Sequence, residues 1–170
     1  MSKPYLIRRL GWYYPTERFN AFFFGAASCY IVWSYPLAKF LFLLHGLISM
    51  TYILFQGQKY WQLKFHRLRG KPFDQTAALA FFRRSQRINL GLIGLMPIVF
   101  LVQTFLLHWT IGSTGILLGA LAANGFAILE HINYYHRQLS VDNLPDWNYI
   151  GRHKRLKVAQ LARDLRDGEI

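Results

Sequence analysis

Cysteine is almost absent from this chain of 170 residues, because Cys29 is the only one. A disulfide framework and a cysteine-based metal site within one chain are therefore excluded. The sequence also lacks a Walker loop, a G-x-G-x-x-G motif, a serine nucleophile elbow and an acid-rich metal motif. Since no catalytic set is complete, the sequence favours a protein that is not an enzyme.

Acidic residues are scarce as well. The chain has 8 Asp and Glu against 20 Lys and Arg, which gives a formal net charge of +12. In a soluble protein this balance would suggest nucleic acid as a partner. Here the basic residues stand between long apolar runs, so we expect anionic lipid headgroups as partners and no nucleic acid.

Apolar sequence is abundant: hydrophobic residues make up 53% of the chain and aromatic residues 17%, with runs near bilayer length. We predict an all-α, polytopic membrane protein of one domain, 1–170, with four transmembrane helices arranged as two hairpins. The predicted spans are 19–34, 36–56, 88–108 and 113–136. The first apolar run begins near Phe19 and continues into the second, so no cleavable signal peptide is expected.

The basic residues predict the orientation of these spans. All Lys and Arg except Lys39 lie in the arms 1–18, 57–87 and 137–170. The positive-inside rule therefore places both termini and the central loop on the cytoplasmic (or stromal) side. Within these arms we expect basic amphipathic helices at the membrane surface, one in the central loop and one at 152–167.

Turn-forming residues predict where several helices begin and end. Thr16, after Pro15, is the expected N-cap of the first span, and Asp74 that of the helix leading into the third. The Gly70-Lys71-Pro72 sequence should end a helix that continues from the second span. Residues 142–147 have the composition of a loop.

Small residues recur every fourth position in two of the predicted spans. They are Ala21, Gly25 and Cys29 in the first, and Gly115, Gly119 and Ala123 in the fourth. Such stripes let two helices approach closely in a membrane. They exceed what a small bundle needs, so we expect contacts with subunits of a larger membrane complex.

A polar cluster follows the apolar part of the fourth span. Its candidate acid/base residues are Glu130, His131, Tyr134 and His136. Glu130 is the only acidic residue in any predicted span, which makes it a functional candidate. The alternative is a structural ion pair with the arginines that precede the third span, Arg83, Arg84 and Arg87.

Histidines offer little support for a metal or haem. His131 and His136 are separated by about 140° around a helix, so they are not expected to share a metal ion. His45, near the middle of the second span, could be the single axial ligand of a tetrapyrrole, or it could make an interhelical hydrogen bond. The many aromatic residues could line a pocket for a quinone, carotenoid or lipid, or could pack helices and form the interface belt.

These observations favour a non-catalytic accessory subunit or assembly factor that binds other integral membrane proteins. The alternative is a small membrane enzyme acting on a lipid, isoprenoid or quinone at the cytoplasmic surface, with the Glu130 cluster as acid and base. A further alternative is a pigment or cofactor carrier that uses His45.

Overall fold

The computed structural model describes residues 3–107, 114–141 and 144–170, and within these ranges the chain forms helices and no strand. The elements are α1 (Lys3–Ser34), α2 (Leu37–Leu68), α3 (Gln75–Leu101), a π-helical turn (Val102–Leu106), α4 (Thr114–Tyr135), α5 (Leu144–His153) and α6 (Gln160–Asp167). The prediction of an all-α chain is confirmed for the residues described.

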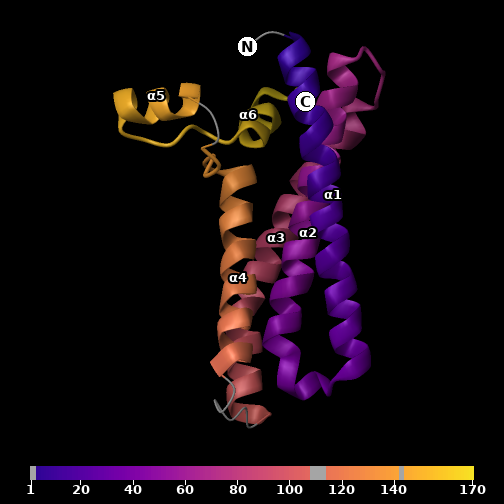
Figure 1. The fold of residues 1–170 in the computed structure, drawn as a ribbon, viewed down its shortest axis with the longest axis vertical. Helices are drawn as coiled ribbons and strands as arrows, with labels where there is room; N and C mark the ends of the chain where they lie inside the picture. Colours follow the sequence, from indigo (N-terminus) through magenta and orange to yellow (C-terminus); the bar gives the residue numbers. More distant parts are fainter. Residues whose placement is uncertain (1–2, 108–113, 142–143) are drawn as a thin grey trace.

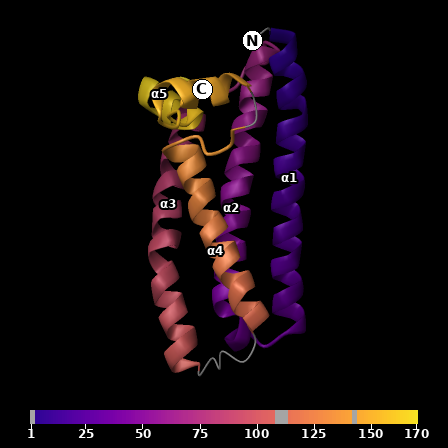
Figure 2. The ribbon, with the colours of Figure 1, turned by 60° about the vertical axis from the view of Figure 1, so that its left-hand side comes forward.

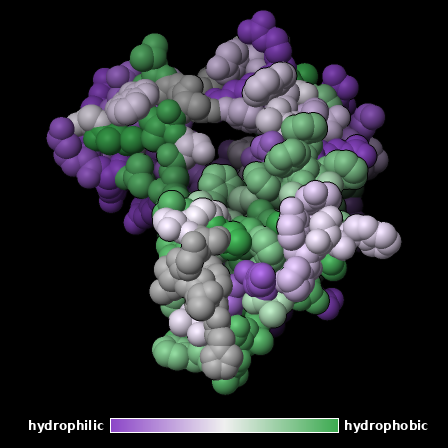
Figure 3. Space-filling view, turned by 60° about the horizontal axis from the view of Figure 1, so that its bottom comes forward, coloured by the Kyte–Doolittle hydropathy of each residue, from purple (hydrophilic) through white to green (hydrophobic). Residues whose placement is uncertain are grey.

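The four long helices lie side by side, and α2 is the central one. It packs against α1 on one side and against α4 and α3 on the others (Figures 1 and 2). Helices α5 and α6 lie at the end of the bundle that also carries both termini (Figure 1). Hydrophilic residues gather at this end, which we call the polar end, and hydrophobic residues dominate the remaining surface seen in Figure 3.

Three helices of the described chain are long and apolar enough to cross a membrane. They are α2, α3 with its π-helical turn, and α4. Helix α1 is not among them, although it runs beside α2 (Figure 1). The predicted connection at 109–112, with the adjoining ends of the third and fourth spans, lies outside the described residues, as do residues 142–143 of the predicted loop.

The first helix begins much earlier than the sequence predicted. Helix α1 is continuous through Pro15, and Thr16 does not cap it: its hydroxyl donates to the Trp12 carbonyl oxygen at 2.9 Å within the helix. The prediction of a boundary here was wrong. Aromatic rings of α1 pack on the C-terminal part of α2: the ring centroids of Tyr13 and Trp61 are 6.0 Å apart, and those of Tyr14 and Phe65 are 5.6 Å apart. These contacts support α1 at Pro15, which lacks the N–H for a helical hydrogen bond.

The predicted connection between α2 and α3 is confirmed. Helix α2 ends at Leu68 and Gly70 has a φ of 71°, in the region that glycine tolerates best. The side chain of Asp74 accepts a hydrogen bond from the Ala77 N–H at 2.9 Å and caps α3. The basic central loop is thus formed by the ends of α2 and α3 themselves, around a short turn.

The C-terminal arm differs from its prediction. Residues 144–147, expected in a loop, belong to α5, and the helix expected over 152–167 begins only at Gln160. Residues 157–159 are extended because their backbone pairs with the end of α4: the Gln138 N–H donates to Lys157 and the Ala159 N–H donates to His136. Asp164 then fixes α6 to α2 by accepting from Tyr60 and pairing with Lys64, each at 2.6 Å.

A buried polar network joins α2, α3 and α4. The side-chain amides of Gln56 and Asn89 exchange two hydrogen bonds, of 2.8 and 2.9 Å, and both residues are almost completely buried. The Tyr135 hydroxyl donates to Gln56 at 2.7 Å and lies 3.3 Å from the Phe82 carbonyl oxygen. In an apolar surrounding, unpaired polar groups are costly, so these contacts hold the three helices in one arrangement.

Candidate functional site

The polar cluster at the end of α4 divides between two sides of the helix, in keeping with 3.6 residues per turn. Tyr134 reaches past α2 to α1, where its hydroxyl donates to Glu17 at 2.9 Å. Tyr135 contacts α2 and α3 instead, and the His131 ring stacks on it with centroids 5.1 Å apart. The candidate acid/base residues therefore do not all converge on one point.

Glu17 is the functional candidate that sequence reasoning missed. It lies one position before Arg18, at the end of the basic arm 1–18. The only indication in the sequence was a single acidic residue next to the start of a predicted span. Its Oε1 accepts from Tyr134, and its Oε2 is buried with no hydrogen-bond donor among the described residues. A carboxylate oxygen in this situation is costly unless it is protonated or meets a ligand.

Gly57 makes the contact between Tyr134 and Glu17 possible. A Cβ atom at this position of α2 would lie 2.2 Å from the Tyr134 hydroxyl oxygen and 2.5 Å from its Cζ. The absence of a side chain therefore leaves the passage through which the tyrosine crosses α2. This is a requirement for glycine that arises from packing, since no unusual backbone angle is involved.

Glu17 and Tyr134 border a pocket at the polar end, which we call the polar-end pocket. It has a volume of about 660 Å³ and lies between α1, the end of α2, the end of α4, and α6 with the chain that leads to it. Its lining includes Tyr13, Glu17, Tyr60, Trp61, Tyr134 and Arg163. The pocket combines aromatic surfaces, basic residues and one acid, Glu17, that has no cationic partner in the described part of the chain, which suits an amphiphilic ligand.

The Glu17 carboxyl should make stability depend on pH. Its pKa is raised to about 7, mainly by burial; the hydrogen bond from Tyr134 lowers the pKa, and the charge of Glu130 makes a smaller contribution that raises it. The folded state thus binds the Glu17 proton more tightly than the unfolded chain does. The contribution of this proton to the free energy of unfolding is complete below a pH of about 4.5 and is lost as pH rises through about 7. We expect Glu17→Gln, whose amide oxygen can still accept from Tyr134, to match the original chain at pH 5 and to be more stable at pH 8.

Thermal unfolding in detergent between pH 5 and pH 8 measures this difference. Asp167→Asn is the matched control, because Asp167 is an exposed carboxylate that pairs only with Arg166. An offset between Glu17→Gln and the original chain that stays constant over this pH range would contradict the expectation.

The predicted ion pair of Glu130 does not form in the structure. Glu130 accepts a hydrogen bond from Asn133 at 3.4 Å, and among the described residues no ion pair joins it to Arg83, Arg84 or Arg87. The guanidinium of Arg83 instead donates to the Leu165 carbonyl oxygen of α6 at 3.3 Å, while Arg84 and Arg87 are exposed. The arginines point away because the side of α3 that faces the other helices carries Phe82, Ser85 and Asn89.

His131 and His136 lie closer together than their spacing predicted. Their ring centroids are 5.3 Å apart, and His136 directly follows the last residue of α4. His131 is buried, and neither of its ring nitrogens has a hydrogen-bond partner among the described residues. Within the described part of the chain, however, no three His, Cys, Asp or Glu side chains come together closely enough to hold a metal ion.

His45 makes an interhelical contact. Its Nδ1 lies 3.2 Å from Oδ1 of Asn124 on α4, and the amide nitrogen of Asn124 donates to the Phe42 carbonyl oxygen at 2.8 Å. Gly46 and Ala123 allow this close approach, since a Cβ at Gly46 would lie 2.9 Å from that of Ala123. Of the two interpretations of His45, the interhelical hydrogen bond therefore accounts for its position.

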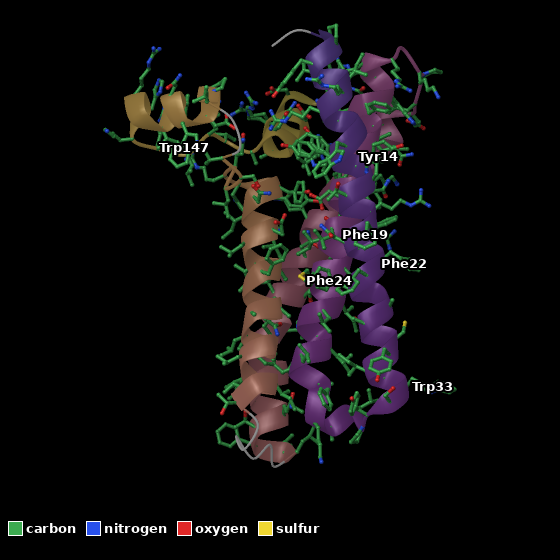
Figure 4. The ribbon with its side chains drawn as sticks, viewed as in Figure 1. Tyr14, Phe19, Phe22, Phe24, Trp33 and Trp147 are labelled. Carbon is green, nitrogen blue, oxygen red and sulfur yellow. The ribbon has the colours of Figure 1, made fainter. Side chains whose placement is uncertain are left out.

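An apolar groove runs between α1 and α2 on the outside of the bundle. It has a volume of about 940 Å³ and is lined by both helices; we call it the α1–α2 groove. Its residues include Ala21, Phe22, Gly25, Cys29, Trp33 and Phe55. Phe22 and Trp33 project from α1 away from the other helices (Figure 4), and Trp33 is 91% exposed.

Comparison with protein-family models, with curated proteins and with solved structures finds no match for this chain. Functional conclusions therefore rest on the geometry of the two cavities and of the helices around them.

Proposed function

We propose that this chain is an integral membrane protein with four spans, α1 included, and with both termini on the cytoplasmic (or stromal) side. In this proposal it acts as a non-catalytic accessory subunit or assembly factor that docks on another membrane protein through the α1–α2 groove. The four-span arrangement is supported by α1, which lies antiparallel to α2 along the bundle (Figure 2), and by the basic residues collected at the polar end.

The observation that carries the proposal is that Gly25, the glycine that lines the α1–α2 groove, is not required by packing inside this chain. Gly46 and Gly57 are required by internal packing, since a Cβ at either would collide with α4. At Gly25 an added Cβ would make only an ordinary contact, 3.5 Å from Thr51, and at Gly115 it would meet nothing within 4 Å. Small residues that serve no internal contact are available for a helix from outside.

The occupant we propose for the groove is a transmembrane helix of another protein. The floor formed by Ala21 and Gly25 allows a second backbone to approach closely, and Phe22 and Trp33 provide an aromatic wall beside it. Helix α1 is long enough for a span, with 32 residues, but is less apolar than the other long helices of the described chain, so a partner against its outer side would stabilise it in the membrane. The candidate acid/base residues, which lie on two sides of α4, give the enzyme alternative less support.

Photo-cross-linking in the native membrane tests this docking. A photoreactive amino acid at Val32, which lines the groove and is 52% exposed, should form one discrete protein adduct. The same amino acid at Ile98 of α3, which is 54% exposed, should give no such adduct. The matched positions separate specific docking from general contact with the bilayer.

Filling the groove provides the second arm of this experiment. Gly25→Leu should abolish the Val32 adduct while the chain remains folded, because the added Cβ makes only an ordinary contact with Thr51 and the rest of the side chain can enter the groove. Gly91→Leu, on an open part of α3, should leave the adduct unchanged. Adducts with lipid alone, or equal adducts from Val32 and Ile98, would refute the proposal.

A further inference from the structure

Charge balance within the polar-end pocket is incomplete at two residues. Lys64 and Lys157 each have a partner, since they pair with Asp164 and Asp146 at 2.6 Å. Among the described residues, Glu17 has no cationic partner and Arg163 has no acidic partner. Both line the same pocket, so a ligand with one positive and one negative group would complete the charge balance at both residues.

Aromatic rings surround the acidic part of this pocket. Trp61 lies between Tyr13 and Tyr60, with ring centroids at 6.0 and 4.8 Å, and Tyr134 contacts Glu17 directly. The electron-rich faces of Trp and Tyr attract ammonium groups, and a nearby carboxylate strengthens this attraction. The acidic end of the pocket therefore has the chemistry of a site for a primary or quaternary ammonium.

The basic part of the pocket lies nearer to solvent. Arg163 is exposed on α6, and its guanidinium can bind a phosphate with two parallel hydrogen bonds. Leu6, Leu10 and Leu161 also line the pocket and offer apolar contact. This combination of polar and apolar surfaces occurs at the polar end of the bundle, and hydrophobic residues dominate the rest of the face seen in Figure 3. In the proposed membrane orientation, the polar end lies at the level of the lipid headgroups.

We propose that the polar-end pocket binds the headgroup of a zwitterionic phospholipid. Its ammonium group lies against Glu17 among the rings of Tyr13, Trp61 and Tyr134, and its phosphate pairs with Arg163. Glu17 lines the pocket and its Oε2 lacks a donor within the described chain, so its carboxyl group supplies the negative charge that attracts the ammonium. This site is separate from the α1–α2 groove and does not depend on docking of a partner helix.

Binding of short-chain lipids to the full chain in detergent tests the proposal. Dihexanoyl phosphatidylethanolamine and phosphatidylcholine should bind about tenfold more tightly than dihexanoyl phosphatidylglycerol, which lacks the ammonium group. Glu17→Gln should remove this preference by weakening the two zwitterionic lipids alone. Asp167→Asn, a carboxylate-to-amide change outside the pocket, should leave all three affinities unchanged.

Arg163→Gln provides an independent variant, because an exposed side chain can be changed without loss of the fold. It should weaken all three lipids by a similar factor, since each carries a phosphate. Free phosphoethanolamine should bind more weakly than the lipid, because it lacks the glycerol and acyl contacts. The proposal is overturned if phosphatidylglycerol binds as tightly as the zwitterionic lipids, if Glu17→Gln keeps the preference, or if Arg163→Gln changes nothing.

Discussion

Gly46→Val is expected to destabilise the bundle by about 3 kcal/mol, because it forces α2 away from α4. The first added atom would already lie 2.8 Å from the backbone nitrogen of Asn124 and 2.9 Å from the Cβ of Ala123. Neither atom can move aside without displacing α4. The displacement would also break the hydrogen bond from Asn124 to the Phe42 carbonyl oxygen, leaving buried polar groups unpaired.

Unfolding in mixed micelles, followed by circular dichroism, measures this loss of stability. Gly91→Val is the matched control, since a Cβ at this position of α3 would meet nothing within 4 Å. We expect the control to stay within about 0.5 kcal/mol of the original chain. Equal stability of the two variants would show that α2 and α4 do not pack at Gly46 in the membrane protein.

Gln56→Leu is expected to destabilise the bundle by about 2 kcal/mol, because it leaves the buried Asn89 amide without its partner. Gln56 makes two hydrogen bonds with Asn89 and accepts a third from Tyr135. Asn89 is fully buried, so water cannot replace the lost contacts. The Tyr135 hydroxyl would retain the Phe82 carbonyl oxygen, 3.3 Å away.

A double-mutant cycle distinguishes a network from two independent residues. Removing both amides, in Gln56→Leu with Asn89→Leu, leaves no unpaired amide, so the double variant should be more stable than either single variant. The free energy of unfolding of all four chains gives the coupling energy. Losses that simply add would mean that the two side chains do not interact.

Local signals in the sequence predicted the ends of helices well where residues at those ends, such as a capping side chain or a glycine, determine the boundary. Asp74 caps α3 through an N–H three residues away, and Gly70 follows the end of α2. Pro15 led to a wrong prediction of a helix boundary, because aromatic contacts with α2 stabilise α1 on either side of it. Residues 154–159 misled for the same reason, since backbone pairing with the end of α4 extends part of them. Contacts with distant segments overrode local preference in both places.

The candidate site was predictable only as far as helical geometry reaches. The separation of Tyr134 from His131 and Tyr135 follows from 3.6 residues per turn. The partner of Tyr134 does not, because Glu17 is 117 positions away and belongs to a helix that reaches α4 only across Gly57. Likewise, the order of the predicted spans places the arginines of α3 and Glu130 at the same end of the bundle. Which side of α3 the arginines occupy depends on how that helix packs, and the sequence does not give this.

The contact of Tyr134 with Glu17 across Gly57 has a consequence for biosynthesis. Residues 3–34 emerge from the ribosome before the other helices, whereas Tyr134 is made only after the third long helix is complete. Helices α1 and α2 can pair early, but the carboxylate of Glu17 gains its donor only when α4 arrives. The hydrogen bond that links α1 to α4 is therefore among the last tertiary contacts to form, after α1 has already packed on α2.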